Sequence, residues 1–202
     1  PFDAVVMGML IGLARELDKG KLADAVRQTL AANGMDRARV RLTITPGSMS
    51  MLKPPAPNQP PPVPTVMVVA QPPTEYDPAY FEKGITVLIT PPMASPFDPM
   101  SGHKTLNYWQ RLRTLRQAAS VGAGEAIWLN LTNHLASGAV SNVFLIKDGT
   151  LLTPIAHGEE ESGALHAPVL PGVTRAAVLA IAQAKRWAGR RQMLSVEDLL
   201  GA

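Results

Sequence analysis

The spacing of apolar and polar residues predicts a helix and then strands in the first part of the chain. Apolar side chains recur every four positions at Leu22, Val26 and Leu30, within a helical pattern that covers residues 3–33. Residues 39–45 (RVRLTIT) then alternate polar and apolar side chains, as a half-buried strand does. The continuous apolar runs at 65–70 (TVMVVA) and 85–90 (ITVLIT) have the length of buried strands.

The pattern predicts a helix and a strand in the middle of the chain. The helix is expected to run from just after Lys104 to Ser120, with an apolar face formed by Leu112, Leu115 and Ala119. The arginines of this helix are expected to point elsewhere (Arg111, Arg113 and Arg116). Residues 126–131 (AIWLNL) form the predicted strand that follows.

A hairpin and a final helix complete the prediction. Residues 142–146 and 150–153 flank Asp148-Gly149, a dipeptide typical of a tight hairpin turn. From Leu170, the sequence LPGVTRAAVLAIAQAK predicts a loop that leads into a helix. The acidic run at 159–161 lies between these elements and is expected to form a solvated loop.

Two proline-rich segments indicate how the chain divides into domains. Residues 46–64 are too rich in proline for a helix or a central strand, so we expect an exposed connection there. A second punctuated segment, PPMASPFDPMSG, covers residues 91–102. We therefore predict a small N-terminal α/β domain at 1–95, a linker at 96–102 and a larger domain at 103–202.

Composition then narrows the classes of function. With 202 residues, of which 46% are hydrophobic and 17% charged, the chain can bury a substantial core. Its formal charge of +3 is small and forms no basic stripe, so we expect no nucleic-acid partner. The absence of cysteine excludes disulfides and thiolate metal sites, and no two histidines lie four residues apart as metal ligands on one helix would.

The N-terminal apolar stretch decides the expectation about membranes. It is too short to span a bilayer and lacks the basic start of a secretory signal. We therefore expect no metal, no membrane segment and a cytoplasmic location.

Candidate chemistry first appears where the final helix begins. Gly172 opens that helix, so the backbone N–H groups of Val173 and Thr174 could hold a phosphate at the positive end of the helix dipole. Most such turns only cap a helix, which makes the signal weak by itself. It gains meaning from three blocks that occur in order along the chain: HKTLNY at 103–108, SNVFLIKDGTLLTP at 141–154 and LPGVTR at 170–175.

Together these blocks resemble the class IV pyridoxal-phosphate aminotransferases, which include branched-chain and D-amino acid aminotransferases and aminodeoxychorismate lyase. The resemblance covers about residues 39–200. It implies the two-domain α/β fold of type IV pyridoxal phosphate enzymes, with a small N-terminal domain and a larger, β-barrel-like C-terminal domain. It also implies pyridoxal 5'-phosphate as cofactor, amino acid and 2-oxo acid substrates, and a homodimer.

The resemblance assigns roles to individual residues. Lys104 matches the lysine that forms a Schiff base with the cofactor, and Tyr108 matches a tyrosine that hydrogen-bonds the cofactor's phenolic oxygen. Val173 and Thr174, after Gly172, match the amides on its phosphate. The side chains of Ser141 and Asn142 are expected to form the floor of the cofactor site.

Lys104 would also shuttle the proton that moves during the reaction. Bonding to the cofactor requires a neutral amine, whereas lysine is ordinarily protonated at neutral pH. We expect burial beside the apolar hairpin to favour the neutral form.

One residue of the expected site departs from the family pattern. Members carry a glutamate five residues before the asparagine, and it keeps the cofactor's pyridine nitrogen protonated. Here that position is Ser137, whose hydroxyl can bond a neutral ring nitrogen but cannot stabilise a pyridinium as a carboxylate does. The electron-accepting power of the ring should therefore be weaker, and Ser137→Glu is predicted to increase transamination.

The ends of the chain also depart from the pattern. It begins inside the region where members carry an arginine for the cofactor phosphate, and it stops soon after the final helix, so both domains are expected to be incomplete. The sequence thus favours an aminotransferase that acts through a Lys104 Schiff base. An aminodeoxychorismate-type lyase and a degenerate homologue with little or no catalysis remain open alternatives.

Overall fold

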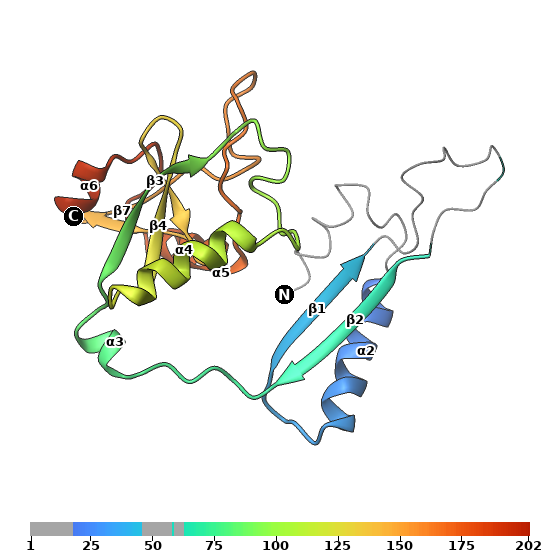
Figure 1. The fold of residues 1–202 in the computed structure, drawn as a ribbon. Helices are drawn as coiled ribbons and strands as arrows, with labels where there is room; N and C mark the ends of the chain where they lie inside the picture. Colours follow the sequence, from blue (N-terminus) through green and yellow to red (C-terminus); the bar gives the residue numbers. More distant parts are fainter. Residues whose placement is uncertain (1–17, 46–57, 59–62) are drawn as a thin grey trace. The chain divides into compact units, whose positions relative to one another are not determined.

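The computed structural model describes residues 18–45, 58 and 63–202, and the chain divides into two compact units, Pro1–Asp77 and Pro78–Ala202 (Figure 1). In the first unit, helix α2 (Lys19–Ala32) packs against strand β2 (Thr65–Gln71). Asp18 begins the helix, because its carboxylate accepts hydrogen bonds from the Gly20 and Lys21 amides at 2.7 and 3.3 Å. The helix ends at Ala32, and Gly34 shortly after it takes a φ of 62°, which suits the turn away from the helix.

Strands β1 (Arg39–Thr45) and β2 form an antiparallel pair that runs from Arg39 opposite Gln71 to Thr45 opposite Thr65. Both strands confirm the predicted segments 39–45 and 65–70. Most of the proline-rich connection at 46–64 lies outside the described residues, as does the part of the predicted N-terminal helix before residue 18.

The second unit contains a three-stranded sheet in the order β3-β4-β5. Strands β3 (Val87–Ala94) and β4 (Glu125–Asn130) are parallel, and β5 (Leu135–Gly138) is antiparallel to β4. Helix α4 (Trp109–Ser120) connects β3 to β4 and packs on both of them (Figure 1).

Strand β3 changes the expected division of the chain. It continues through Pro91 and Pro92 with irregular register, which an edge strand tolerates because its outer side needs no N–H donors. Since β3 pairs with β4, it belongs to the second unit rather than to an N-terminal domain that extends to residue 95. The units divide between Asp77 and Pro78, before the segment 96–102 that we predicted as the linker.

A second sheet has the order β6-β7-β8, formed by Leu145–Lys147, Thr150–Thr153 and Gly189–Arg191. The Asp148-Gly149 turn joins β6 to β7 as predicted, and both residues have positive φ, at 49° and 70°. Helix α5 (Val173–Ala184) begins at the predicted place. The short helices α3 (Ala79–Glu82) and α6 (Val196–Leu200), together with β5 and β8, have no counterpart in the sequence prediction.

Strand β4 organises the core because both of its faces are buried. Ala126 and Trp128 belong to one cluster, which consists mostly of alanines and includes Ala118 of α4. Ile127 and Leu129 point to the opposite face, where they join a larger-residue cluster with β6 and β7. Both units thus combine helices with sheets, which confirms the predicted α/β class.

The buried face of α4 agrees only in part with the predicted one, since Leu115 packs against the core as expected but Leu112 does not lie inside. Thr114 and Ala118 are 3% and 0% exposed, whereas Leu112 is 48% exposed. The inner face therefore runs through Arg111, Thr114 and Ala118, at the i, i+3, i+7 spacing of a helix. Thr114 is held there because its hydroxyl accepts a hydrogen bond from the Trp128 indole N–H at 2.9 Å.

In the part of the chain that the structure describes, no helix is long and apolar enough to cross a membrane.

Candidate functional site

A cavity of about 270 Å³ lies within the second unit, around the loop that precedes α4 and the start of that helix. The turn after β5 and the loop before α5 complete its wall. Four of the residues predicted from the sequence line it: Tyr108, Ser137, Ser141 and Asn142. The other four (Lys104, Gly172, Val173 and Thr174) lie outside its lining but are tied to it through the contacts that follow.

Lys104 is linked to the cavity through Tyr108. Its Nζ donates a hydrogen bond to the Tyr108 hydroxyl oxygen at 2.8 Å and lies 4.7 Å from the centre of the tyrosine ring. Tyr108 can hold this position because it is the residue that begins α4 and takes a non-helical conformation. The predicted burial of Lys104 beside the hairpin is wrong for the described residues, since its side chain is exposed.

Asn142 connects the cavity to the start of α5. Its side-chain amide donates to the Leu170 carbonyl oxygen at 2.9 Å. A β-carbon placed on Gly172 would lie only 2.1 Å from the Asn142 Oδ1, so this position has room for glycine alone. No side chain caps α5, which leaves the first N–H groups, at Val173 and Thr174, available to an anion.

Glu125, the first residue of β4, holds the turn that carries Ser141. Its carboxylate accepts hydrogen bonds from the Ser141 hydroxyl at 2.8 Å and from the Ala139 and Ala126 amides at 3.1 and 2.9 Å. Ser141 thus supports the wall of the cavity through its hydroxyl. The sequence prediction missed Glu125, because two of its partners, Ala139 and Ser141, follow β5 and are 14 and 16 residues away.

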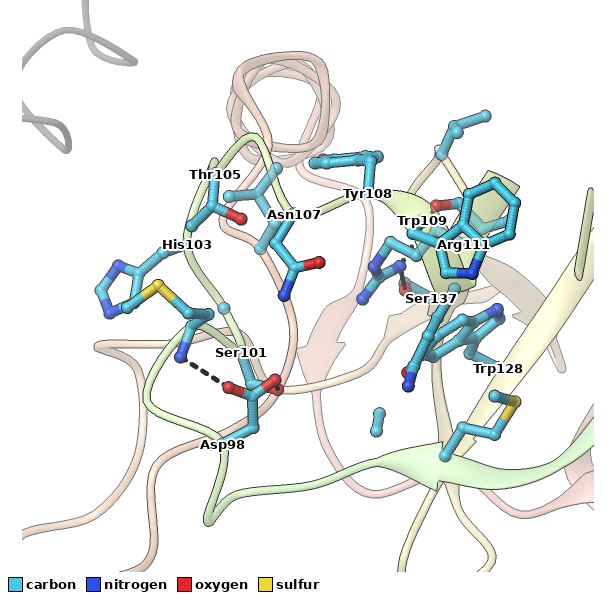
Figure 2. Close-up of a pocket in the computed structure, with 18 of the residues that line it drawn as sticks. Asp98, Ser101, His103, Thr105, Asn107, Tyr108, Trp109, Arg111, Trp128 and Ser137 are labelled. Atoms are coloured by element: carbon cyan, nitrogen blue, oxygen red, sulfur yellow. Dashed lines mark hydrogen bonds between the residues drawn. The ribbon is translucent and has the colours of Figure 1, made fainter. Parts of the chain in front are cut away.

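Arg111 is the second residue that the sequence prediction missed. Its Nη1 lies 3.0 Å from the Ser137 hydroxyl oxygen and 3.1 and 3.2 Å from the carbonyl oxygens of Gly138 and Ala139. The guanidinium also lies over the Trp128 ring, 4.6 Å from its centre. Figure 2 shows Arg111 directed toward Ser137 beside Trp128. The i, i+3, i+7 spacing of Arg111 with Thr114 and Ala118 is the sequence signal that could have identified it.

The electrostatics of Arg111 reflect its half-buried position. Burial lowers the pKa of its guanidinium, while the neighbouring Tyr108 and Glu125 act in the opposite direction. Arginine nevertheless stays protonated in proteins. The cavity therefore holds a permanent positive charge next to Ser137.

His103 lines another edge of the cavity and belongs to a group of three histidines. His103 contacts His157, and His157 contacts His166, with ring centres 4.5 and 5.5 Å apart. Burial and these two neighbours lower the pKa of His103. Among the described residues, no group of three or more His, Asp or Glu side chains could hold a metal ion.

The contact between Gly172 and Asn142 gives a first prediction. Gly172→Ala should push Asn142 away from Leu170 and displace the start of α5, because the new methyl group and Oδ1 cannot both be accommodated. We expect pyridoxal phosphate to bind on the order of tenfold more weakly, measured by absorbance titration. Gly189→Ala is the matched control, since its β-carbon would make only an ordinary 3.8 Å contact. Equal affinities of the two variants would contradict this account of the loop.

Known proteins are similar to this chain in sequence and in fold. The family model described as amino-transferase class IV matches residues 7–202. The branched-chain-amino-acid aminotransferase of Escherichia coli K12 is 30% identical over 183 residues, which cover 89% of this chain and 55% of that protein. The Salmonella typhimurium enzyme of the same name is 28% identical over 186 residues, with the same coverage. The chain therefore spans little more than half the length of these relatives.

Solved structures agree with this relationship. The Escherichia coli branched-chain amino acid aminotransferase matches with a TM-score of 0.78 and 26% identity, over 97% of this chain and 62% of that chain. A candidate 4-amino-4-deoxychorismate lyase from Legionella pneumophila has the same TM-score of 0.78 at 19% identity, over 95% of this chain and 65% of that chain. These likenesses confirm the predicted α/β fold of the family.

Proposed function

The chain belongs to the class IV aminotransferase family, and from that premise we propose that it is a pyridoxal-phosphate enzyme that moves an amino group between an amino acid and a 2-oxo acid. The observation that carries the proposal is the 2.8 Å hydrogen bond between Lys104 Nζ and the Tyr108 hydroxyl. It pairs the amine that would hold the cofactor with the phenol that would contact the cofactor's own phenolic oxygen. The branched-chain names of the relatives make branched-chain amino acids the first donors to test.

The residues of the site fit pyridoxal phosphate at three points. Lys104 supplies an amine, Tyr108 a hydroxyl beside that amine, and the uncapped start of α5 supplies N–H donors for a phosphate. Asn142 joins the α5 loop to the cavity that contains Tyr108, so one site can use all three. At the expected position of the ring nitrogen, the fit differs from that of the family, because Ser137 and Arg111 occupy it.

Each of these residues has a defined task in the proposed reaction. When bound, pyridoxal phosphate supplies an aldehyde that takes up the amino group and a ring that accepts electrons from the substrate's α-carbon. Lys104 would hold the cofactor covalently, and its amine would be free to move the proton of the α-carbon once the substrate's amino group has displaced it. The Tyr108 hydroxyl contacts this amine and fixes its direction, while Val173 and Thr174 anchor the phosphate through their backbone N–H groups.

An absorption spectrum followed by chemical trapping tests the proposal. Addition of pyridoxal phosphate should produce a visible absorption band, and borohydride should then fix the label on the peptide that contains Lys104. A label on any other lysine, or no band at all, would refute the assignment. The second outcome would favour a homologue that does not bind the cofactor.

The reaction type needs a separate assay on protein that is loaded with pyridoxal phosphate and has not been treated with borohydride. Transamination converts a branched-chain amino acid to its 2-oxo acid only when a second 2-oxo acid accepts the amino group. A lyase would instead release pyruvate from aminodeoxychorismate without an acceptor. Formation of the branched-chain 2-oxo acid that depends on the acceptor supports our proposal, and pyruvate release alone would replace it with the lyase.

The resemblance also leads us to propose that the protein acts as a homodimer. Sedimentation of the purified chain over a range of concentrations would measure this, with one species of twice the mass of 21.6 kDa as the expected result. A monomer at all concentrations would count against it.

A further inference from the structure

We propose that Arg111, acting through Ser137, keeps the ring nitrogen of the bound cofactor unprotonated, so that this site has the opposite charge at that position from the glutamate-containing members of the family. The inference rests on the proposed function. It concerns only the far end of the cofactor ring, away from Lys104. Arg111 is a positioning residue in this proposal, and Ser137 is the group that contacts the ring nitrogen.

The first step is the orientation of Arg111. It lies on the inner face of α4 with Thr114 and Ala118, and the helix cannot turn this face outward without exposing both. Its guanidinium is fixed between the Trp128 ring and the oxygen atoms of the turn that follows β5. The 3.0 Å contact with Ser137 is therefore built into the fold.

The second step concerns the proton of the Ser137 hydroxyl. A guanidinium has only N–H donors, so the Ser137 oxygen must accept in its contact with Arg111. The single hydroxyl proton is then free to be donated elsewhere. A ring nitrogen with an unshared electron pair is a suitable acceptor for that proton, whereas a pyridinium is a donor.

The third step is the balance of charge around this end of the cavity. Only the Ser137 side chain would separate the Arg111 guanidinium from the ring nitrogen. A positive charge so placed opposes protonation of that nitrogen. Glu125 carries an opposing charge, but it does not line the cavity, and its carboxylate faces Ser141 and two backbone amides rather than Ser137. Asp98, a carboxylate among the cavity-lining residues, accepts from the Met100 amide at 2.9 Å in the loop before Lys104.

Tyr108 and His103 complete the titratable groups that line the cavity. Tyr108 bonds Lys104, at the other end of the expected cofactor position. Burial and two further histidines lower the pKa of His103, which favours its neutral form, so this side chain brings no charge that would oppose that of Arg111. Arg111 is therefore the charged cavity residue that contacts Ser137, the side chain expected at the ring nitrogen.

This arrangement changes the expected result of Ser137→Glu. A glutamate at 137 would lie against the Arg111 guanidinium and form an ion pair with it, instead of serving the ring nitrogen. The single substitution should therefore leave transamination largely unchanged, contrary to the expectation from sequence. Removal of the positive charge in Arg111→Gln/Ser137→Glu should be required to restore the family arrangement.

The decisive measurement is the nitrogen NMR signal of pyridoxal phosphate labelled with ¹⁵N in its ring and bound to the whole chain. In the unmodified protein near neutral pH, we expect the resonance of an unprotonated pyridine. Arg111→Lys should retain it, because the charge is retained. The double variant should shift it to the pyridinium position and raise transamination by roughly tenfold, the factor that corresponds to one pKa unit of differential stabilisation.

Arg113→Gln is the matched control, since Arg113 is an exposed arginine on the same helix. It should leave the resonance and the rate unchanged. A pyridinium signal in the unmodified protein would overturn the inference, as would an unchanged signal in the double variant. If the double variant does not fold, the spectrum of the unmodified protein and that of Arg111→Lys still decide the question.

Borohydride trapping distinguishes failure of this inference from failure of the proposed function. A label on Lys104 together with a pyridinium signal would overturn only the role of Arg111. The absence of a Lys104 label would overturn the proposed function, and the role of Arg111 with it.

Discussion

Replacement of Lys104 with alanine is expected to lower transamination by at least about 1,000-fold, because the same amine would hold the cofactor and move the substrate proton. Borohydride should then label no residue of the variant. Lys104→Arg should fail equally, although it keeps the positive charge beside Tyr108, since a guanidinium cannot form the covalent bond. Each protein preparation is divided, so that activity is measured on one portion and the borohydride label on the other.

Lys185→Ala is the control for this prediction. Lys185 also lies over an aromatic ring, with its Nζ 5.5 Å from the centre of the Trp187 ring. It is distant in sequence from the loop that precedes α4, and it does not line the cavity. Its removal should leave both label and rate unchanged. Because Lys104 is exposed, the free energy of unfolding of the Lys104 variants should remain within a few tenths of a kcal/mol of the parent value, as measured by thermal unfolding. Residual transamination above a hundredth of the parent rate would contradict the role of Lys104.

Arg175→Ala is expected to reduce the free energy of unfolding by about 3–5 kcal/mol, the effect of breaking a buried ion pair. The Arg175 side chain is 2% exposed, and its Nη2 lies 2.7 Å from a Glu159 carboxylate oxygen. Arg175 also donates to the Pro154 carbonyl at 2.9 Å and to the Thr153 hydroxyl at 3.3 Å. Truncation would leave these acceptors without their donor and Glu159 with only the more exposed Arg191 and the Ala156 amide, which denaturant unfolding would detect.

Arg191→Ala provides the comparison, because Arg191 contacts the same carboxylate at 3.1 Å with a side chain that is 52% exposed. An exposed pair contributes at most about 1 kcal/mol, so this variant should lose far less stability. Equal losses from the two arginine variants would show that burial of Arg175 is not the source of its effect.

The same network predicts how stability depends on acidity. Burial alone would raise the pKa of Glu159, but the hydrogen bonds from Arg175 and the Ala156 amide, with the charges of Arg175 and Arg191, lower it below 4.5. A lowered pKa means that the stabilisation is present above the pKa of the unfolded chain and is lost as pH falls through that of the folded chain. Arg175→Ala should therefore show a smaller loss of stability on acidification than the parent. Parallel curves for the two proteins would contradict this linkage.

Local patterns in the sequence predicted most of the strands and the final helix. The turn at Asp148-Gly149 and the start of α5 at Gly172 depend on backbone preferences that a few neighbouring residues determine. The segment from Lys104 to Tyr108 is similarly local, and the structure brings these two side chains into contact. The cofactor roles of the predicted site residues stay predictions until the trapping and NMR experiments are done.

Features that depend on distant partners were not predicted. The inner face of α4 contains Arg111 because Trp128 and the turn after β5 receive its guanidinium, and neither is near it in sequence. Glu159 was expected in a solvated loop, yet it binds Arg175 on α5. The domain boundary was misplaced for a related reason, since only the pairing of β3 with β4 reveals that Pro91 and Pro92 lie in an edge strand.

The alanine-rich cluster between α4 and the β3-β4-β5 sheet restricts how this protein can evolve. Its members include Ala118, Ala126, Ala136 and Ala139, all at most 1% exposed, so almost any replacement adds atoms where none fit. Substitutions should therefore be accepted less often at these alanines, of which Ala139 also lines the cavity, than at the polar residues of the cavity wall. Related proteins could then differ in the charges at positions 137 and 111 while the distance between α4 and the sheet stays the same.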